Sequence, residues 1–439
     1  MNRLRGALKR QQSYEPLEND PEIQDDEYDE SIEEGSMKNQ FAWIEYSVFL
    51  LVGVAMLWAW NMFMAAAPYF QRRFKHSPWI LSNFQSAILS VSTITNLSSM
   101  LILTNLQAKA SYPKRISSSL VINIVTFTFL ALSTTFFRDI PEGVYFVFLL
   151  LTVAAASFAS ALSQNGLFSY ASGFGRPEYT QAIMTGQGLA GVLPCVAQIL
   201  SVISVSENDA LGDSPPVHTS SAFAYFLTAT LISAFALGSF VWLHHHQTPE
   251  DHPSKLSTDE SSSLPHTPVS LLTLFFKLRY LALGIFLCFG VTMSFPVFTT
   301  EILSIHPDSR PGVFIPLAFL LWNLGDFIGR IITISPVFVI HHRPSILFIF
   351  SIARTAFVPL YLLCNIGGHG AIIQSDFFYL VIIQFFFGLS NGWLSSNCMM
   401  GAGEWVNVEE REAAGGFMGL MLVSGLTVGS LASFLIGGD

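Results

Sequence analysis

Long apolar runs separated by short polar segments occupy most of the chain after residue 43. Runs of roughly 20 apolar residues have the length of a helix that crosses a hydrocarbon core. We count eleven such runs and predict a membrane-spanning helix from each. They lie at about 43–69, 80–106, 116–137, 144–173, 179–205, 221–243, 270–300, 312–340, 344–363, 377–402 and 413–436. In the seventh run, Lys277 and Arg279 place the predicted start of the spanning part near Tyr280.

Two polar stretches divide the chain into parts. Residues 1–40 include an acidic segment without Lys or Arg, and this composition predicts a disordered cytosolic tail. Residues 244–269 are rich in Ser, Pro and His and predict a disordered cytosolic linker. The linker separates a six-helix bundle at 41–243 from a five-helix bundle at 270–439. The fold class is therefore an all-α polytopic membrane protein with a 6+5 arrangement.

The composition agrees with lipid as the main solvent. Hydrophobic residues make up 51% of the chain and charged residues 12%, about half the charged share of ordinary soluble domains. The net charge of −10 comes mainly from the acidic tail, so no nucleic-acid-binding surface is implied. The four cysteines lie in apolar runs, where we expect small packing residues and not disulfides.

The distribution of Lys and Arg predicts the orientation. With the N-terminus in the cytosol, the cytosolic segments hold 14 of these residues and the opposite loops hold five. Lys and Arg favour cytosolic loops, and an odd number of spans places the C-terminus on the extracytosolic side.

No catalytic or metal-binding constellation is predicted. The patterns HExxH and GxxxxGK[ST] are absent from the sequence, so an enzyme and the hydrolysis of nucleotides are not indicated. The histidines at 244–246 suggest either a solvated tract or a metal site. They have no suitably spaced Cys or acidic partner, which favours the solvated tract. We expect no metal and no cofactor.

The eighth apolar run carries charges that a lipid-facing helix would not hold. Asn323, Asp326 and Arg330 fall on one helical face. An Asp–Arg pair that only lets the helix insert is one interpretation. An exposed pair of this kind contributes a fraction of a kcal/mol, whereas a charge at the bilayer centre costs about 2.5–3.5 kcal/mol. Because the cost of the charge exceeds the gain from the pair, we favour the second interpretation, in which this face of the helix meets water or protein and binds a ligand.

Two other helices offer candidate binding groups. Gln164 has an amide donor and acceptor that suit the edge of a planar heterocycle. Leu57, Trp60 and Met64 lie close to one stripe of the first helix, where they form either ordinary packing or a flat wall for a ring. For the glycines of "TGQGLAG" (185–191) and "SNGWLSSNCMMGAG" (390–403) we favour close helix packing, with amides bonding across the gap.

Several longer motifs resemble those of the equilibrative nucleoside transporter family along nearly all of the membrane portion. They are "WNMFMAAAPYF" (60–70), "QNGLFSYASG" (164–173), "EYTQAIMTGQGLAGVLP" (178–194), "FPVFTTEI" (295–302), "WNLGDFIGR" (322–330), "ARTAFVPLYLLCN" (353–365), "SNGWLSSNCMMGAGEWV" (390–406) and "EAAGGFMGLMLVSGLTVGSLASF" (412–434). The most characteristic is the NxxDxxxR signature formed by Asn323, Asp326 and Arg330.

The resemblance implies a passive carrier of nucleosides, with nucleobases as further candidate substrates, and an architecture related to the major facilitator superfamily. It implies that Arg330 and Asp326 approach the ribose hydroxyls and that Gln164 contacts the base. The remaining contacts that it implies are Trp60, Met64, Leu57, Leu426, Leu97 and Met100. The partners expected are a nucleoside substrate and the lipid bilayer, without nucleic acid or an obligate protein partner.

The chain departs from the family pattern at two positions. Ala59 replaces a proline before Trp60, which predicts a milder kink there. Ser160 replaces a glycine four residues before Gln164 and adds bulk beside the predicted pocket. We keep as alternatives a proton-coupled nucleoside symporter, a non-transporting membrane sensor or scaffold, and a sugar or drug carrier. The short first outer loop favours a vacuolar or lysosomal membrane over the cell surface.

Overall fold

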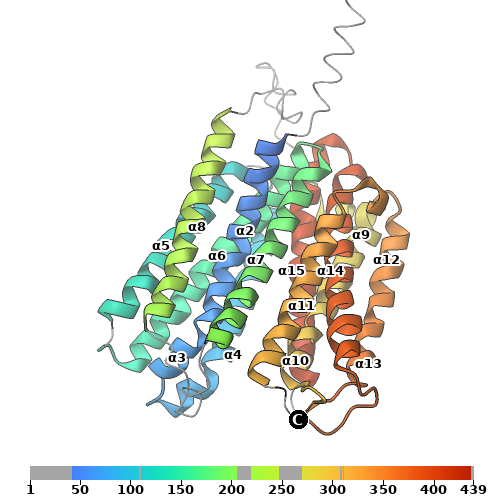
Figure 1. Ribbon diagram of the computed structural model, residues 1–439. Coiled ribbons are helices and arrows are strands. Elements are labelled where there is room, and N and C mark those ends of the chain that lie inside the picture. Colours follow the sequence, from blue (N-terminus) through green and yellow to red (C-terminus); the bar gives the residue numbers. More distant parts are fainter. Residues whose placement is uncertain are drawn as a thin grey trace, which may run out of the picture. The chain divides into compact units, whose positions relative to one another are not determined.

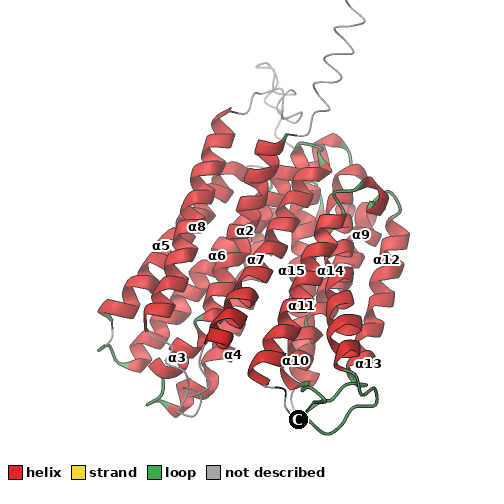
Figure 2. Cartoon of the chain, in the orientation of Figure 1, coloured by secondary structure: helices red, strands yellow, loops and turns green. Residues whose placement is uncertain are grey.

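The computed structural model describes residues 42–107, 110–137, 139–204, 219–246, 269–306, 309 and 311–436. The predicted acidic tail and residues 247–268 of the predicted linker lie outside this range. Ile44–Asp439 form one compact unit, and the description below concerns that unit. Its described residues are almost entirely helical (Figure 2).

Eleven helical spans in the described residues are long and apolar enough to cross a membrane, and the protein is a multi-pass membrane protein. The first half of the unit contains α2 (Trp43–Ala65), α3 (Ala67–Arg73), α4 (Pro78–Asn105), α5 (Tyr112–Phe136), α6 (Glu142–Gly173), α7 (Pro177–Ser204) and α8 (Thr219–His246). The second contains α9 (Leu271–Thr292), α10 (Ser294–Glu301), α11 (Pro311–Ile332), α12 (Pro344–Ala353), α13 (Phe357–Tyr361), the π-helix η4 (Phe378–Phe385), α14 (Phe386–Gly401) and α15 (Arg411–Ile436). We call these sets the N-half and the C-half (Figure 1).

Proline sets the start of several helices. Pro78, Pro177, Pro311 and Pro344 are each the first residue of their helix, where the missing N–H has no intrahelical partner to lose. The predicted span boundaries hold to within a few residues at most positions. One differs: the run at 312–340 leaves the helix at Ile332, because Pro336 begins a separate short turn.

One expectation about a polar segment needs correction. Helix α8 continues through His246, so the linker does not begin at residue 244. His244 is half-buried and stacks on Phe240 of the same helix, with ring centroids 6.4 Å apart. Helix α9 begins at Leu271, so Lys277 lies within the helix and before Tyr280. Lys277 is accommodated there by Glu410, whose Oε2 lies 2.6 Å from Nζ.

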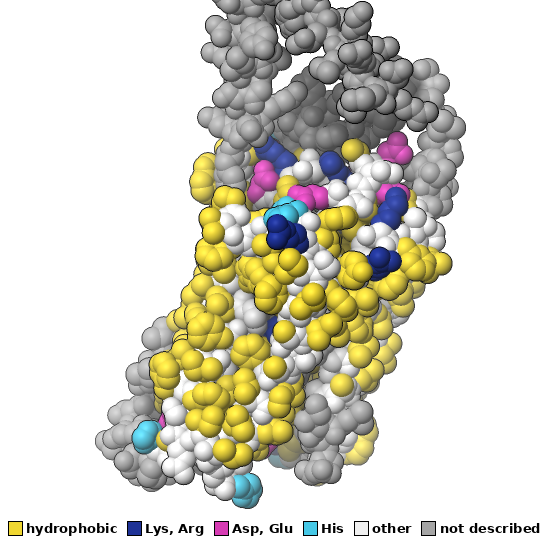
Figure 3. Space-filling model, turned by 90° about the vertical axis from the view of Figure 1, so that its right-hand side faces the viewer, with side chains coloured by type: hydrophobic (Ala, Val, Ile, Leu, Met, Phe, Trp, Pro, Cys, Tyr) yellow, Lys and Arg dark blue, Asp and Glu magenta, His cyan; other side chains and the backbone are white. Residues whose placement is uncertain are grey.

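Each half has its own apolar core. In the N-half, Phe63, Phe127 and Phe226 lie in one buried cluster. In the C-half, Phe298 and Tyr361 stack with ring centroids 4.9 Å apart within a second cluster. The outer surface is also apolar: on the face formed by the C-half, hydrophobic side chains cover the middle and charged side chains gather toward one end (Figure 3). This is the distribution expected of a protein surrounded by lipid.

Glycines let α11 and α14 approach to backbone contact. Gly325 of α11 faces the backbone at Phe385, the last residue of η4, and Gly329 faces that of α14 at Leu389. Gly392 of α14 faces the carbonyl oxygen of Asp326. A Cβ atom at any of the three would overlap a backbone oxygen of the other helix. Small residues four apart are the usual means of close helix packing in membranes. The close contacts expected of the glycine in "SNGW" are therefore present.

The Gly392→Ala variant tests this packing. Its added methyl group should force α14 away from α11 and lower the free energy of unfolding by about 1–3 kcal/mol. The measurement is the midpoint of thermal unfolding in detergent. Gly238→Ala is the matched control, since a Cβ at Gly238 meets no atom within 4 Å and alanine favours helix by about 1 kcal/mol. An unchanged midpoint for Gly392→Ala would contradict the packing.

Candidate functional site

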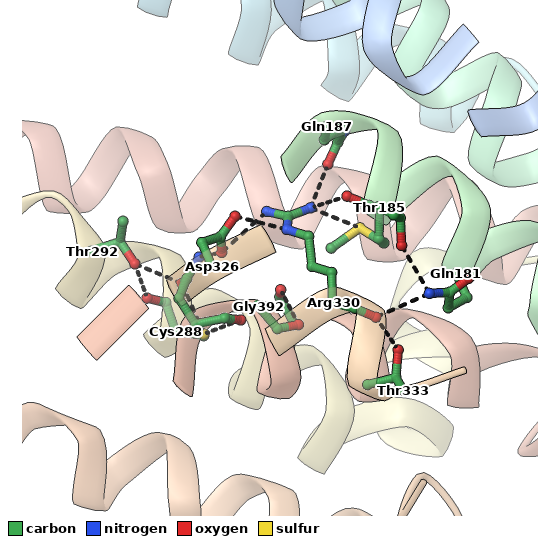
Figure 4. A network of polar contacts seen from close by, with 12 residues as sticks. Gln181, Thr185, Gln187, Cys288, Thr292, Asp326, Arg330, Thr333 and Gly392 are labelled. Atoms are coloured by element: carbon green, nitrogen blue, oxygen red, sulfur yellow. Dashed lines mark hydrogen bonds and ion pairs between the residues drawn. The ribbon is translucent and has the colours of Figure 1, made fainter. Parts of the chain in front are cut away.

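Asp326 and Arg330 lie one turn apart on α11, on the face that packs against α7 and α14. Arg330 Nε donates to Asp326 Oδ2 at 2.8 Å (Figure 4). Each residue is only 4% exposed. The pair therefore faces protein and not lipid, and it is more than an isolated intrahelical pair, because other helices supply further partners.

Arg330 joins the two halves of the unit. Its Nη1 donates to the carbonyl oxygen of Met184 at 2.7 Å and to Gln187 Oε1 at 3.2 Å. Gln181 Nε2 in turn donates to the backbone oxygen of Arg330 at 3.0 Å. All three partners belong to α7 of the N-half (Figure 4). The arginine therefore holds α7 and α11 together at this level.

The carboxylate of Asp326 connects to the rest of the C-half. Asn391 of α14 donates from Nδ2 to Asp326 Oδ1 at 2.6 Å. The Oδ1 atom of Asn391 accepts from Thr292 Oγ1 of α9 at 2.8 Å. A continuous set of hydrogen bonds thus runs from α9 through α14 and α11 to α7.

The pair retains some hydrogen-bonding capacity. Guanidinium has five N–H donors, and each carboxylate oxygen can accept two bonds. Arg330 Nη2 has a single contact among the described residues, a long one of 3.5 Å to Asp326 Oδ1. Within the same residues, Asp326 Oδ2 accepts only from Arg330 Nε. One strong donor and one acceptor position therefore remain available to a further polar group.

Asn323 shares the predicted stripe but has separate partners. Its Nδ2 donates to the carbonyl oxygen of Phe319 at 2.9 Å and lies 3.5 Å from Cys195 Sγ of α7. Its side chain also fills the space in front of Gly191. The residue is therefore placed between the halves, next to the ion-pair network and not within it.

Two predicted residues meet against α15. An added Cβ at Gly419 would lie 3.2 Å from Met100 Cε and 3.7 Å from Gln164 Cγ. Gln164 is 7% exposed and Met100 is fully buried. The structure therefore brings the predicted base-binding amide and one apolar contact to the same point of the C-half.

The other predicted contacts have varied surroundings. Ser160 donates its hydroxyl to the carbonyl oxygen of Ala156 at 3.0 Å, within its own helix. Trp60 packs against the N-half core, and Met64 is 57% exposed. Three further residues are half-buried, and these are Leu57, Leu97 and Leu426. In the conformation described, Trp60 therefore has the surroundings of an ordinary packing residue of the N-half.

Sequence analysis missed four residues that complete the network. These are Gln181, Met184, Gln187 and Asn391. Gln187 and Asn391 lie in the glycine-rich segments for which amide bonds across helices were expected. The sequence therefore indicated that these amides bond across helices, but it did not indicate which group each amide would bond to. Met184 contributes its backbone carbonyl, which no side-chain pattern reveals.

Arg354, which lies in the predicted span at 344–363, belongs to the packing of the C-half. It is 2% exposed, and its guanidinium carbon lies 4.1 Å from the centroid of the Phe387 ring. It donates to Ser390 Oγ at 3.1 Å and to the carbonyl oxygens of Phe387 and Cys288. Backbone carbonyl groups and a hydroxyl group accept the N–H bonds of this guanidinium. They lower the free-energy cost of burying its charge within the membrane, although no carboxylate pairs with it.

The two halves meet on one side of the unit. On α7 the hydrogen bonds to α11 run from Gln181 to Cys195. On α15, Gly415 and Gly416 face α6 of the N-half, whereas Gly425 and Gly429 face α9 of the C-half. The contacts between the halves therefore lie toward the side of the unit that holds the C-terminal end of α6 and the N-terminal end of α7. We call this the closed side.

Comparison with known proteins identifies the family. The family model described as Nucleoside transporter matches residues 150–263 and 243–437, which is more than half of the chain. The chain belongs to the nucleoside transporter family. It is accordingly a transporter and not an enzyme.

Relatives in this family match most of the chain. Nucleoside transporter FUN26 of Saccharomyces cerevisiae is 30% identical, with 89% of this chain and 84% of that protein covered. Human equilibrative nucleoside transporter 1 is 29% identical, with 88% and 95% covered. The resemblance inferred from the motifs is thereby confirmed.

Solved structures with a similar fold are major facilitator superfamily transporters. FucP in its outward conformation matches with a TM-score of 0.55 and 15% identity, covering 90% of this chain and 97% of that one. The xylose symporter XylE matches with a TM-score of 0.57 and 12% identity, covering 90% and 87%. At these identities the likeness shows the fold, and it confirms the predicted architecture.

Cys195 of this nucleoside transporter offers a test of the contact between α7 and α11. It is half-buried, whereas Cys288, Cys364 and Cys398 are buried. In the native protein a maleimide should label Cys195, and Cys195→Ala should abolish the labelling. Gly188→Ala should speed it several-fold, since a Cβ there would lie 2.9 Å from Arg330 Cδ and separate the helices. Equal labelling rates with and without this methyl group would contradict the contact.

Proposed function

We propose that this protein is a facilitative nucleoside carrier in which Arg330 and Asp326 bind the ribose. The observation that carries the proposal is the buried pair itself, which retains one donor on Nη2 and one acceptor position on Oδ2. A vicinal diol needs both, and guanidinium with carboxylate supplies both. Charges at membrane depth are rare and most often belong to a transport path.

The proposed base contacts come from the N-half and from α15. Gln164 would bond the edge of the base, and Met100, which meets the same glycine of α15, would pack on its face. The other proposed wall residues are Leu57, Trp60, Met64, Leu97 and Leu426, with Ser160 limiting the space beside Gln164. Since they lie on α2, α4, α6 and α15, a closed pocket requires movement of the halves.

We propose that the two halves rock about the site as rigid bodies. Separate apolar cores in each half support this motion, as does the confinement of the contacts between halves to one side. With the N-terminus in the cytosol, as the distribution of Lys and Arg indicates, the closed side is cytosolic. The described conformation is then closed on the cytosolic side, and alternating access follows from opening the contacts of α7.

The proposed transport is not coupled to protons. The charge of Asp326 is balanced by Arg330, whose Nε donates to Oδ2 at 2.8 Å, so the site needs no further cation. Uptake into proteoliposomes is therefore expected to be the same with and without an inward proton gradient. A several-fold rise with the gradient would instead support the proton-coupled symporter.

The Arg330→Ala variant tests the proposed site. It removes the ribose donor and leaves Asp326 buried without its cation, a change that typically costs 3–5 kcal/mol. Uptake of labelled uridine and adenosine by proteoliposomes should fall at least a hundredfold. Arg343→Ala, at an exposed arginine, should transport normally. Normal uptake by a correctly inserted Arg330→Ala protein would return the pair to a structural role.

We also propose a vacuolar or lysosomal membrane as the location. The support is the short loop between α3 and α4, which has little room for the modifications of a cell-surface loop. Fluorescence microscopy of a tagged protein should show an internal membrane, and a signal confined to the cell surface would refute this location.

A further inference from the structure

We propose that Asn391 is a positioning residue that keeps the Asp326–Arg330 pair open to a sugar. The inference rests on the proposed ribose-binding function of that pair. Asn391 is 1% exposed, and its neighbour Gly392 is in backbone contact with Asp326. The α14 backbone is therefore fixed directly against the carboxylate-bearing turn of α11, which leaves the amide little freedom to move.

The orientation of the amide is determined by the carboxylate that it meets. The carboxylate of Asp326 is an acceptor only, so it requires the donor Nδ2. The amide oxygen Oδ1 then faces Thr292 Oγ1 at 2.8 Å and Cys288 Sγ at 3.3 Å, and both groups can donate to it. A flipped amide would place its oxygen against the carboxylate, where two acceptors repel.

This bond explains an asymmetry in the ion pair. Arginine and carboxylate ordinarily form two parallel bonds of similar length. Here Nε to Oδ2 is 2.8 Å, whereas Nη2 to Oδ1 is 3.5 Å. Asn391 holds Oδ1 at 2.6 Å and thereby keeps it away from Nη2. The donor on Nη2 and the acceptor position on Oδ2 remain unused for that reason.

Without Asn391 the carboxylate can turn about its side-chain bond and meet Arg330 with both oxygens. The pair would still be buried and neutral overall, but its donor would be consumed internally. A nucleoside with a complete ribose would then lose its hydrogen bonds to the pair, whereas a sugar without the hydroxyls would lose little.

The test measures uptake of uridine and of 2′,3′-dideoxyuridine by proteoliposomes that contain the full chain. In Asn391→Ala, uridine uptake at low substrate concentration should fall about tenfold, the usual effect of losing one hydrogen bond to a charged group. Dideoxyuridine uptake should change less than about twofold, so the ratio of the two rates falls toward that of Asp326→Ala. Asn397→Ala is the matched control, a buried asparagine of α14 that bonds to Ile340 and Phe338, and it should keep the wild-type ratio.

A second pair of variants covers the case in which Asn391→Ala does not fold. Thr292→Val removes the hydroxyl that bonds to the amide oxygen of Asn391, and Thr292→Ser keeps it. The valine variant should lower the uridine-to-dideoxyuridine ratio more than the serine variant. Parallel loss of both substrates, or equal ratios in the valine and serine variants, would overturn the positioning role. A wild-type protein that carries both substrates equally would instead overturn the ribose-binding function on which the role rests.

Discussion

The buried pair of Asp326 and Arg330 is the constraint on which the rest of the structure depends. Lipid supplies no hydrogen-bond partners, so charged groups at this depth require partners from the protein. Asn391 supplies one from α14, and Met184 and Gln187 supply others from α7. Each partner can reach the pair only if its helix approaches α11 closely. The glycines of the α11–α14 and α7–α11 contacts meet this requirement.

The two contacts of α11 differ in kind. Toward α14, within the C-half, Gly325, Gly329 and Gly392 place backbone against backbone, and such a contact cannot open without losing packing over several turns. Toward α7, the bonds are made by side chains of Arg330 and Gln181. Side chains can exchange one partner for another while the helices separate. This difference suits an α7–α11 interface that opens and closes during transport, next to an α11–α14 interface that stays closed.

Arg330 participates in both contacts at once. Its bond to Asp326 is made within α11 and is preserved when the halves separate, whereas its bonds to α7 are lost. A substrate that replaces the α7 partners would offset the cost of leaving a buried guanidinium under-bonded, which is 1–3 kcal/mol or more for a charged group. In the proposed mechanism, substrate binding and the movement of the halves are connected through the side chain of Arg330.

The sequence by itself determined the number of spans, their approximate positions and the family, because apolar run length and the NxxDxxxR motif are local properties. It also placed Asn323, Asp326 and Arg330 on one face, since a helix has a fixed repeat. Only the tertiary structure decided what that face meets. The partners Met184, Gln187 and Asn391 come from helices far apart in the chain, and one of them acts through its backbone. Likewise, helical spacing in the sequence grouped Leu57, Trp60 and Met64. Whether these side chains face a ligand or the N-half core depends on how the helices pack and on which side of the unit the halves are in contact.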